Sequence, residues 1–253
     1  MKVFEIVFSP TGGTQRVANI IARELGGELV QIDLSDRNAD FSTVLLGEDD
    51  ITVIAMPSFA GLVPQIATER LSKIKGNNAN AVLVCVYGNR AYEDTLVEMQ
   101  DTAEKCGFKV VAALSAVAEH SIMHQYATGR PDAEDEVVLR GFANQILDKI
   151  HNGIKNEFII PGNRPYKKSG GGGLVPEPTK ACVNCGICAV SCPVGAIDTN
   201  DVTKTDLEKC IYCMRCVAKC PKSARRVNEA MVNVIAMKLK KVCSVKKENE
   251  LFI

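Results

Sequence analysis

The chain has 253 residues, of which 46% are hydrophobic and 24% are charged, and its formal net charge is zero. This length exceeds that of one small domain and predicts two domains of ordinary soluble composition. No apolar run is long enough to span a bilayer, and residues 1–8 are too short for a signal peptide, so a cytoplasmic location is expected.

The first predicted element is a strand over residues 2–8, followed by the turn Ser9-Pro10-Thr11-Gly12-Gly13-Thr14 and a helix that ends near Gly26. A glycine- and hydroxyl-rich turn between a strand and a helix is typical of an anion site. Backbone N–H groups converge there, and the helix N-terminus favours negative charge. The turn matches neither the Walker pattern nor G-x-G-x-x-G.

Further strands are predicted at residues 28–34, 51–56, 79–87 and 108–118, with helices between about 64 and 75, at 93–106 and at 133–151. Several of these strands are apolar throughout, which is typical of strands that are buried on both faces. The pattern therefore predicts an α/β domain with a doubly wound, five-stranded parallel sheet.

Three loops of this domain follow strands and are rich in glycine, hydroxyl or aromatic residues: 9–14, 57–62 and 87–92. Ligands of such sheets bind beyond the carboxyl ends of the strands. The loops resemble those with which flavodoxins hold FMN, the first at its phosphate and the other two around its isoalloxazine ring. The resemblance implies an FMN-binding domain over residues 1–154. The implied FMN-binding residues are Ser9, Thr11, Gly12, Gly13, Thr14, Pro57, Ser58, Phe59, Ala60, Gly61, Tyr87, Gly88, Asn89 and Tyr92, with Phe59, Tyr87 and Tyr92 as candidates to flank the ring.

His120 follows the last of these strands on the same rim. A histidine there could contact the flavin or a substrate, or donate a proton, which makes it the one candidate catalytic residue. The alternative is an ordinary polar side chain with its hydrogen bonds satisfied. Residues 122–132 are expected to form a loop or short helix that could cover the site.

Residues 155–178 are predicted to be a linker, because they contain four consecutive glycines and several prolines. Two cysteine runs with the spacing C-x2-C-x2-C-x3-C-P follow. In two-cluster ferredoxins with this spacing, the fourth cysteine of each run binds the other cluster. The spacing therefore assigns one 4Fe–4S cluster to Cys182, Cys185, Cys188 and Cys220, and a second to Cys210, Cys213, Cys216 and Cys192.

The two runs resemble the bacterial two-cluster ferredoxins over residues 179–227, and the resemblance implies a small α+β domain. Zinc does not fit, because structural zinc sites take four ligands, typically as two separated pairs. Disulfides do not fit a chain without signs of secretion. No role is assigned to the remaining Cys85, Cys106 and Cys243.

The charges are unevenly distributed. Residues 179–227 contain eight basic and four acidic side chains, whereas the first 178 residues are net acidic. The basic excess offsets the negative charge that eight thiolates and two oxidised clusters carry together. We therefore do not predict nucleic-acid binding.

The last segment, residues 228–253, is predicted to be an amphipathic helix over 228–243 with a short tail. The helix is expected to dock back on one of the two domains. Its lysines leave contact with a membrane surface as the less favoured alternative.

The whole chain resembles the flavodoxin–ferredoxin fusions of anaerobic bacteria and archaea. The resemblance implies an electron-transfer protein that relays low-potential electrons between two 4Fe–4S clusters and FMN, and exchanges them with redox partner proteins. The alternative is an FMN-dependent reductase of a small molecule, fed with electrons by the ferredoxin domain. Transfer within one chain and transfer between the two chains of a homodimer both stay open.

Overall fold

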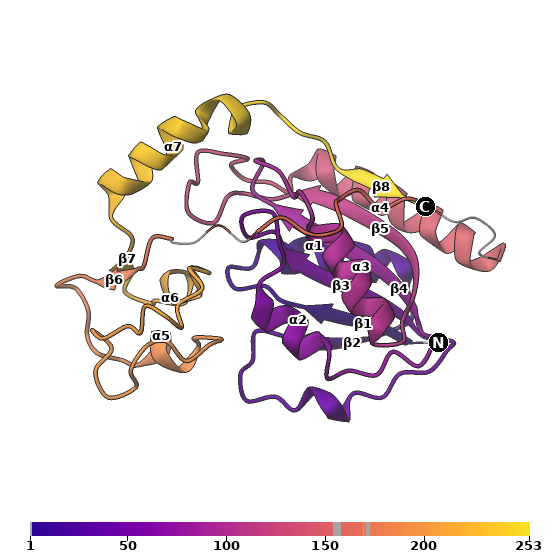
Figure 1. The fold of residues 1–253 in the computed structure, drawn as a ribbon, viewed down its shortest axis with the longest axis horizontal. Coiled ribbons are helices and arrows are strands. Elements are labelled where there is room, and N and C mark those ends of the chain that lie inside the picture. Colours follow the sequence, from indigo (N-terminus) through magenta and orange to yellow (C-terminus); the bar gives the residue numbers. More distant parts are fainter. Residues whose placement is uncertain (1, 154–157, 169, 171–172) are drawn as a thin grey trace.

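The computed structural model describes residues 2–153, 158–168, 170 and 173–253. These residues form an α/β domain and a smaller cysteine-rich domain, and the helix α7 (Glu229–Cys243) runs from the second domain back to the first (Figure 1). Within the described ranges, no helix is both long and apolar enough to cross a bilayer.

A parallel sheet forms the centre of the first domain. Its strands are β1 (Lys2–Val7), β2 (Glu28–Asp33), β3 (Ile51–Pro57), β4 (Asn80–Tyr87) and β5 (Lys109–Val117). All five are parallel, and they lie in the order β2-β1-β3-β4-β5. This is the order of flavodoxin-like doubly wound sheets, whose topological switch point lies between the first and third strands. The predicted fold class is confirmed.

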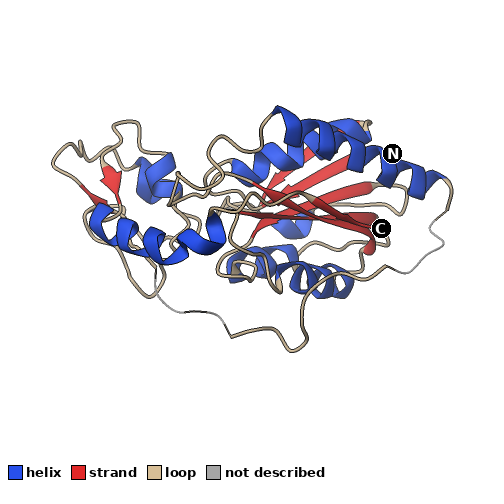
Figure 2. Ribbon diagram, turned by 90° about the horizontal axis from the view of Figure 1, so that it is seen from above, coloured by secondary structure: helices blue, strands red, loops and turns tan. Residues whose placement is uncertain are grey.

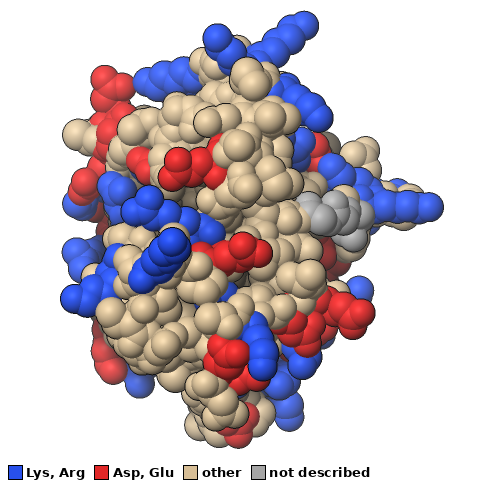
Figure 3. All heavy atoms as spheres, turned by 90° about the vertical axis from the view of Figure 1, so that its left-hand side faces the viewer, with Lys and Arg blue, Asp and Glu red and all other residues tan. Residues whose placement is uncertain are grey.

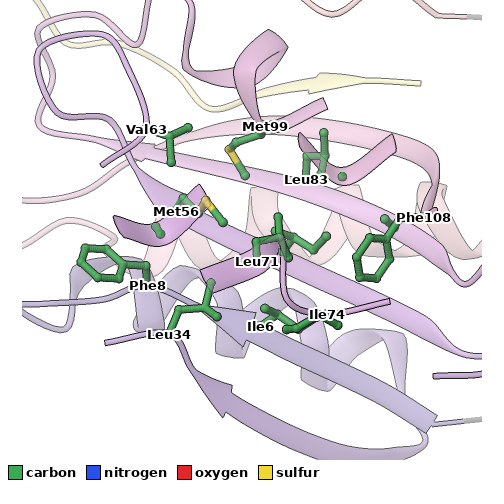
Figure 4. Close-up of a cluster of buried hydrophobic side chains, with 14 of the residues drawn as sticks. Ile6, Phe8, Leu34, Met56, Val63, Leu71, Ile74, Leu83, Met99 and Phe108 are labelled. Atoms are coloured by element: carbon green, nitrogen blue, oxygen red, sulfur yellow. The ribbon is translucent and has the colours of Figure 1, made fainter. Parts of the chain in front are cut away.

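Helices cover both faces of the sheet (Figure 2). The helices α1 (Gly13–Leu25) and α4 (Ala133–His151) pack on one face, and α2 (Gln65–Leu71) and α3 (Thr95–Lys105) pack on the other. Because successive strand side chains point to opposite faces, each face has its own apolar core. Figure 4 shows one of these cores, in which Leu71 and Met99 from two helices meet Ile6, Met56 and Leu83 from three strands. A short 3-10 helix, η1 (Phe41–Thr43), lies between β2 and β3.

A sixth strand, β8 (Glu250–Phe252), extends the sheet beyond the five predicted strands. It lies antiparallel to β5, with Leu251 opposite Leu114. The tail after α7 therefore returns to the first domain and covers the β5 edge of its sheet (Figures 1 and 2). A strand of three residues is too short to show the alternation that identifies longer strands.

The second domain contains short elements: β6 (Glu177–Pro178), α5 (Ile187–Val190), α6 (Arg215–Ala218) and β7 (Arg225–Arg226). Strands β6 and β7 pair antiparallel. Ile197 and Thr205 form an isolated antiparallel bridge. Strand β6 lies inside the segment predicted as a linker, so the pairing of the second domain begins before residue 179.

Part of the predicted linker, residues 158–168, lies along α3. The backbone N–H groups of Asn163 and Lys167 both donate to the Asp94 carboxylate, at 2.8 and 2.7 Å, and Arg164 pairs with Asp101. These contacts hold the segment on the first domain without any helix or strand. Although the predicted linker is rich in glycine and proline, this part of it is therefore bound to the first domain.

Candidate functional site: two cysteine-lined cavities beside an anion-binding loop

The loop at residues 9–14 connects β1 to α1 at the carboxyl end of the sheet. The Ser9 hydroxyl accepts a hydrogen bond from the Gln15 N–H at 3.0 Å, and the Ser9 N–H donates to the Ser35 hydroxyl at 3.2 Å. Gly12 has a φ of 99°, which favours glycine, and a Cβ there would meet open space. Among the described residues, the N–H groups of Gly13 and Thr14 have no acceptor. The loop therefore presents free donors at the start of a 13-residue helix, as an anion requires.

The other two predicted loops, residues 57–62 and 87–92, lie on the same rim, because they follow the neighbouring strands β3 and β4. Ser58 accepts a hydrogen bond from Thr95 at 2.8 Å, and Asp94 donates its N–H to Gly61 at 3.0 Å. A Cβ on Gly61 would lie 2.0 Å from the Glu93 carboxylate. The close contact between the two loops therefore explains why residue 61 is a glycine.

Two of the predicted flavin residues, Asn89 and Tyr92, contact the C-terminal segment after α7 and the last turn of that helix. Asn89 is 4% exposed, and its side-chain amide donates to the carbonyl oxygens of Cys243 and Val245 at 2.7 and 2.9 Å. The Tyr92 hydroxyl donates to Glu250 at 2.8 Å, and its ring meets that of Tyr87 edge-on, with centroids 5.3 Å apart. The tail thus shares the rim with the predicted flavin loops. Sequence reasoning missed this, because no local pattern links residue 89 to residue 245.

His120 is held in a neutral form next to one of these loops. Its Nδ1 accepts hydrogen bonds from the N–H groups of Ile122 and Met123, both at 3.2 Å, and its ring packs where a Cβ on Gly88 would be. Burial lowers the pKa of His120 to about 4, and the charges of His124 and Arg90 add to the effect. Its ring is therefore uncharged at pH 7, and the contacts shown here are structural ones.

The eight predicted cluster ligands line two separate cavities, in the crossed sets of four that the spacing assigned. One cavity is bordered by Cys182, Cys185, Cys188 and Cys220, and the other by Cys192, Cys210, Cys213 and Cys216. The two runs also repeat one backbone pattern. Asn184 and Gly186 in the first run, and Tyr212 and Met214 in the second, have positive φ angles at corresponding positions. The cavity bordered by Cys182 is the first cluster cavity, and the cavity bordered by Cys210 is the second cluster cavity.

The surroundings of the sulfurs suit iron–sulfur clusters. Burial raises the pKa of Cys213 to about 12 and that of Cys216 to about 11, so both thiols would have to lose a proton on binding iron. Backbone N–H groups donate to the fourth sulfur of each run: Ala196 to Cys192 at 3.3 Å, and Ala224 to Cys220 at 3.2 Å. Such amide–sulfur bonds stabilise negative charge on a cluster and tune its potential.

Two arginines fasten the second cluster cavity to the first domain. Arg70 from α2 donates to the Pro193 carbonyl oxygen at 2.6 Å, directly after the predicted ligand Cys192. Arg215, which lies between the predicted ligands Cys213 and Cys216, donates to the Ser9 carbonyl oxygen at 3.2 Å and pairs with Asp33 at 3.3 Å. The second cluster cavity therefore adjoins the anion-binding loop. Sequence reasoning missed both arginines, whose partners across the junction lie 123 to 206 residues away in the chain.

Comparison with known proteins finds one matching family model and several similar solved structures. Residues 181–230 match the family model of the 4Fe-4S dicluster domain. A search of curated proteins finds no match to the chain. The first domain is similar to a flavodoxin from Streptococcus pneumoniae TIGR4, with 19% identity, a TM-score of 0.41, and coverage of 58% of this chain and 97% of that one. It is also similar to flavodoxin 1 from Bacillus cereus, with 16% identity, a TM-score of 0.41, and coverage of 58% of this chain and 98% of that one. A flavodoxin from the domain Archaea matches with 13% identity, a TM-score of 0.43, and coverage of 60% of this chain and 99% of that one.

The chain therefore consists of a flavodoxin-like α/β domain followed by a 4Fe–4S dicluster domain. The first assignment rests on the strand order, and the second on the family match and the two sets of four cysteines. Together, the two domains imply a role in electron transfer.

Proposed function

We propose that this protein carries electrons between two 4Fe–4S clusters, an FMN bound on the loops at the rim of the first domain, and external redox proteins. The observation that carries the proposal is the junction between the domains. Arg70 and Arg215 hold the second cluster cavity next to the loop at residues 9–14. A fixed distance between two redox groups makes their electron exchange intramolecular, which raises its effective concentration.

In this proposal the iron–sulfur clusters supply one-electron chemistry, and FMN accepts one or two electrons. The chain supplies the positions. The free N–H groups of Gly13 and Thr14 would bind the FMN phosphate, and the eight cysteines would hold the two clusters. In this proposal, residues 1–154 form the flavin domain and residues 179–227 form the cluster domain. Strand β6, which pairs with β7, belongs to the cluster domain as well.

External redox partners would exchange electrons with the cluster in the first cluster cavity. Near its ligands, Val183 and Val190 are 59% and 63% exposed, and Cys185 is exposed. Basic and acidic side chains are interspersed on this end of the molecule (Figure 3). A partially apolar surface with both signs of charge suits a transient redox partner protein.

One observation favours the alternative of a reductase. A cavity of about 660 Å³ lies between the loop at residues 125–130 and the C-terminal half of α7, and Asn89 from the predicted flavin loop lines it. This volume suits a small organic molecule. An anaerobic screen for steady-state FMN oxidation by organic acceptors separates the two functions, because a carrier turns over with redox proteins and a reductase with the small molecule.

The relay is tested by mixing the anaerobic holoprotein with less reductant than it can accept and following flavin absorbance afterwards. We expect a first-order phase whose rate does not depend on protein concentration. In Cys213→Ala, which removes a ligand of the second cluster, this phase should be lost, and the remaining transfer should become second-order in protein.

Cys185→Ala is the matched variant, since it removes a ligand of the first cluster and leaves the second beside the flavin loop. It should keep the concentration-independent phase, and the EPR signal of the remaining cluster confirms that each variant is folded. If Cys213→Ala kept that phase, the second cluster would not be the neighbour of the flavin. If the reconstituted wild type bound no flavin, the proposal would fail altogether.

A further inference from the structure

We propose that Arg215, a residue of the dicluster domain, completes the phosphate site of the flavin domain, so that the FMN phosphate is bound across the domain junction. The inference rests on the proposed FMN binding and goes beyond it, because it assigns part of the flavin site to the iron–sulfur domain. The ligand class is a phosphate monoester, and the prediction separates FMN from riboflavin.

The anion-binding loop has no cation of its own. Residues 9–14 contain only hydroxyl, glycine and proline residues. The nearest basic residue along the chain, Arg16, donates to the Pro131 carbonyl oxygen at 2.7 Å and is occupied there. Loop N–H and hydroxyl groups alone would face a phosphate that carries nearly two negative charges at pH 7.

Arg215 brings a cation to this loop from the other domain. It is the first residue of α6, its side chain is only 14% exposed, and its Nη1 lies 3.2 Å from the Ser9 carbonyl oxygen. Its Nη2 lies 3.3 Å from Asp33 at the end of β2. The guanidinium therefore sits at the rim between the ends of β1 and β2, where the loop begins.

The hydrogen bonds of Arg215 are incomplete. Its Nε is buried and has no acceptor among the described residues. A buried donor without a partner is destabilising, so an acceptor that reaches this guanidinium would stabilise the junction. A guanidinium offers five N–H donors in a fixed fork that suits the oxygens of a phosphate, and Ser9 and Asp33 engage only two of them.

The test compares the affinities of FMN and riboflavin for flavin-free protein with intact clusters, measured anaerobically by quenching of flavin fluorescence. Arg215→Gln should weaken FMN binding about tenfold, the effect of one lost charge-assisted hydrogen bond at a partly exposed site, and leave riboflavin binding unchanged. Arg215→Lys keeps the charge but not the fork, so its FMN affinity should fall between those of the wild type and Arg215→Gln.

The matched control is Arg37→Gln. Arg37 lies at the same junction, with its guanidinium 3.2 Å from the position of a Cβ on Gly195, and its removal lowers the charge equally. It should change neither affinity. Iron content and cluster absorbance confirm that each variant retains its clusters. If Arg215→Gln loses its clusters, the FMN and riboflavin affinities of Arg215→Lys are compared with those of the wild type instead.

Equal weakening of FMN and riboflavin in the Arg215 variants would show that Arg215 only holds the domains together, and would overturn the inference. Unchanged FMN affinity would overturn it as well. Both results leave the proposed electron carrier intact, because the wild type still binds FMN in each case. If the wild type with intact clusters binds neither flavin, the proposed function fails together with the inference.

Discussion

At the scale of single residues, Arg130 and Asp135 form an ion pair that is 6% and 4% exposed. Asp135 also accepts hydrogen bonds from the Asp132 N–H, which completes the capping box of α4, and from Asn249 in the tail, both at 2.9 Å. Burial alone would raise the pKa of Asp135, but the hydrogen bonds from Arg130, Asp132 and Asn249 outweigh it and lower the pKa to about 2. One carboxylate thus joins a helix start, a loop and the tail.

Asp135→Asn should destabilise the protein by about 3–5 kcal/mol at pH 7, because it leaves Arg130 buried without a counter-charge. The measurement is urea unfolding of the wild type and variant as a function of pH. Since the pKa is lower in the folded state, the advantage of the wild type is complete above about pH 4 and disappears as the pH falls toward 2.

The control for this prediction is Glu136→Gln on the same helix. Glu136 pairs with Arg140 on the surface, where their side chains are 46% and 49% exposed, so its loss should cost less than about 1 kcal/mol. An Asp135→Asn variant no less stable than Glu136→Gln would show that the buried pair does not hold this region.

At the scale of elements, the tail after α7 holds the rim of the sheet. Asn249 accepts a hydrogen bond from the Val117 N–H at 2.9 Å, and the Glu250 carboxylate accepts from Tyr92 at 2.8 Å and from Ser115 at 3.0 Å. Strand β8 also pairs with β5. The polar groups at the end of β5 therefore depend on a segment more than 130 residues further along the chain.

Deletion of residues 248–253 should destabilise the flavodoxin-like domain by about 2–4 kcal/mol, because several side-chain hydrogen bonds of about 0.5–1.5 kcal/mol each are lost. Hydrogen exchange should become faster in β5, whose edge is then open, and less so in the central strand β3. Deletion of Ile253 alone, outside β8, should have little effect. Unchanged exchange in β5 of the longer deletion would contradict a structural role of the tail.

At the scale of the whole molecule, the two domains differ in what keeps them folded. The flavodoxin-like domain has two extensive apolar cores, whereas the buried apolar cluster of the dicluster domain contains only five residues, one of them the predicted ligand Cys192. Its strands have two residues each, and its two helices have four each. A domain with so small a core needs its metal for stability.

Anaerobic removal of iron with a chelator should therefore unfold the dicluster domain and leave the sheet of the first domain intact. Hydrogen exchange followed by mass spectrometry should show loss of protection over residues 177–226, while β3 and β4 stay protected as an internal control. Persistent protection of the dicluster domain without iron would show that its side chains suffice to fold it.

The sequence by itself determined the features that depend on local spacing. Apolar strands alternating with amphipathic helices predicted the parallel sheet, and the observed strand order agrees with it. The cysteine spacing predicted the two crossed sets, such as Cys192 with Cys210, and the same sets border the two cavities. Both signals are local, because they arise from the geometry of a few consecutive residues.

Only the tertiary structure decided how the parts meet. The contact of Arg215 with Ser9 spans 206 residues, and that of Asn89 with Val245 spans 156. An arginine between two cysteines and a short polar tail have no periodicity that would identify their partners. These contacts depend on which surfaces face each other after both domains have folded. For that reason the sequence predicts the loops and the ligands, while the junction that brings them together follows from the three-dimensional arrangement alone.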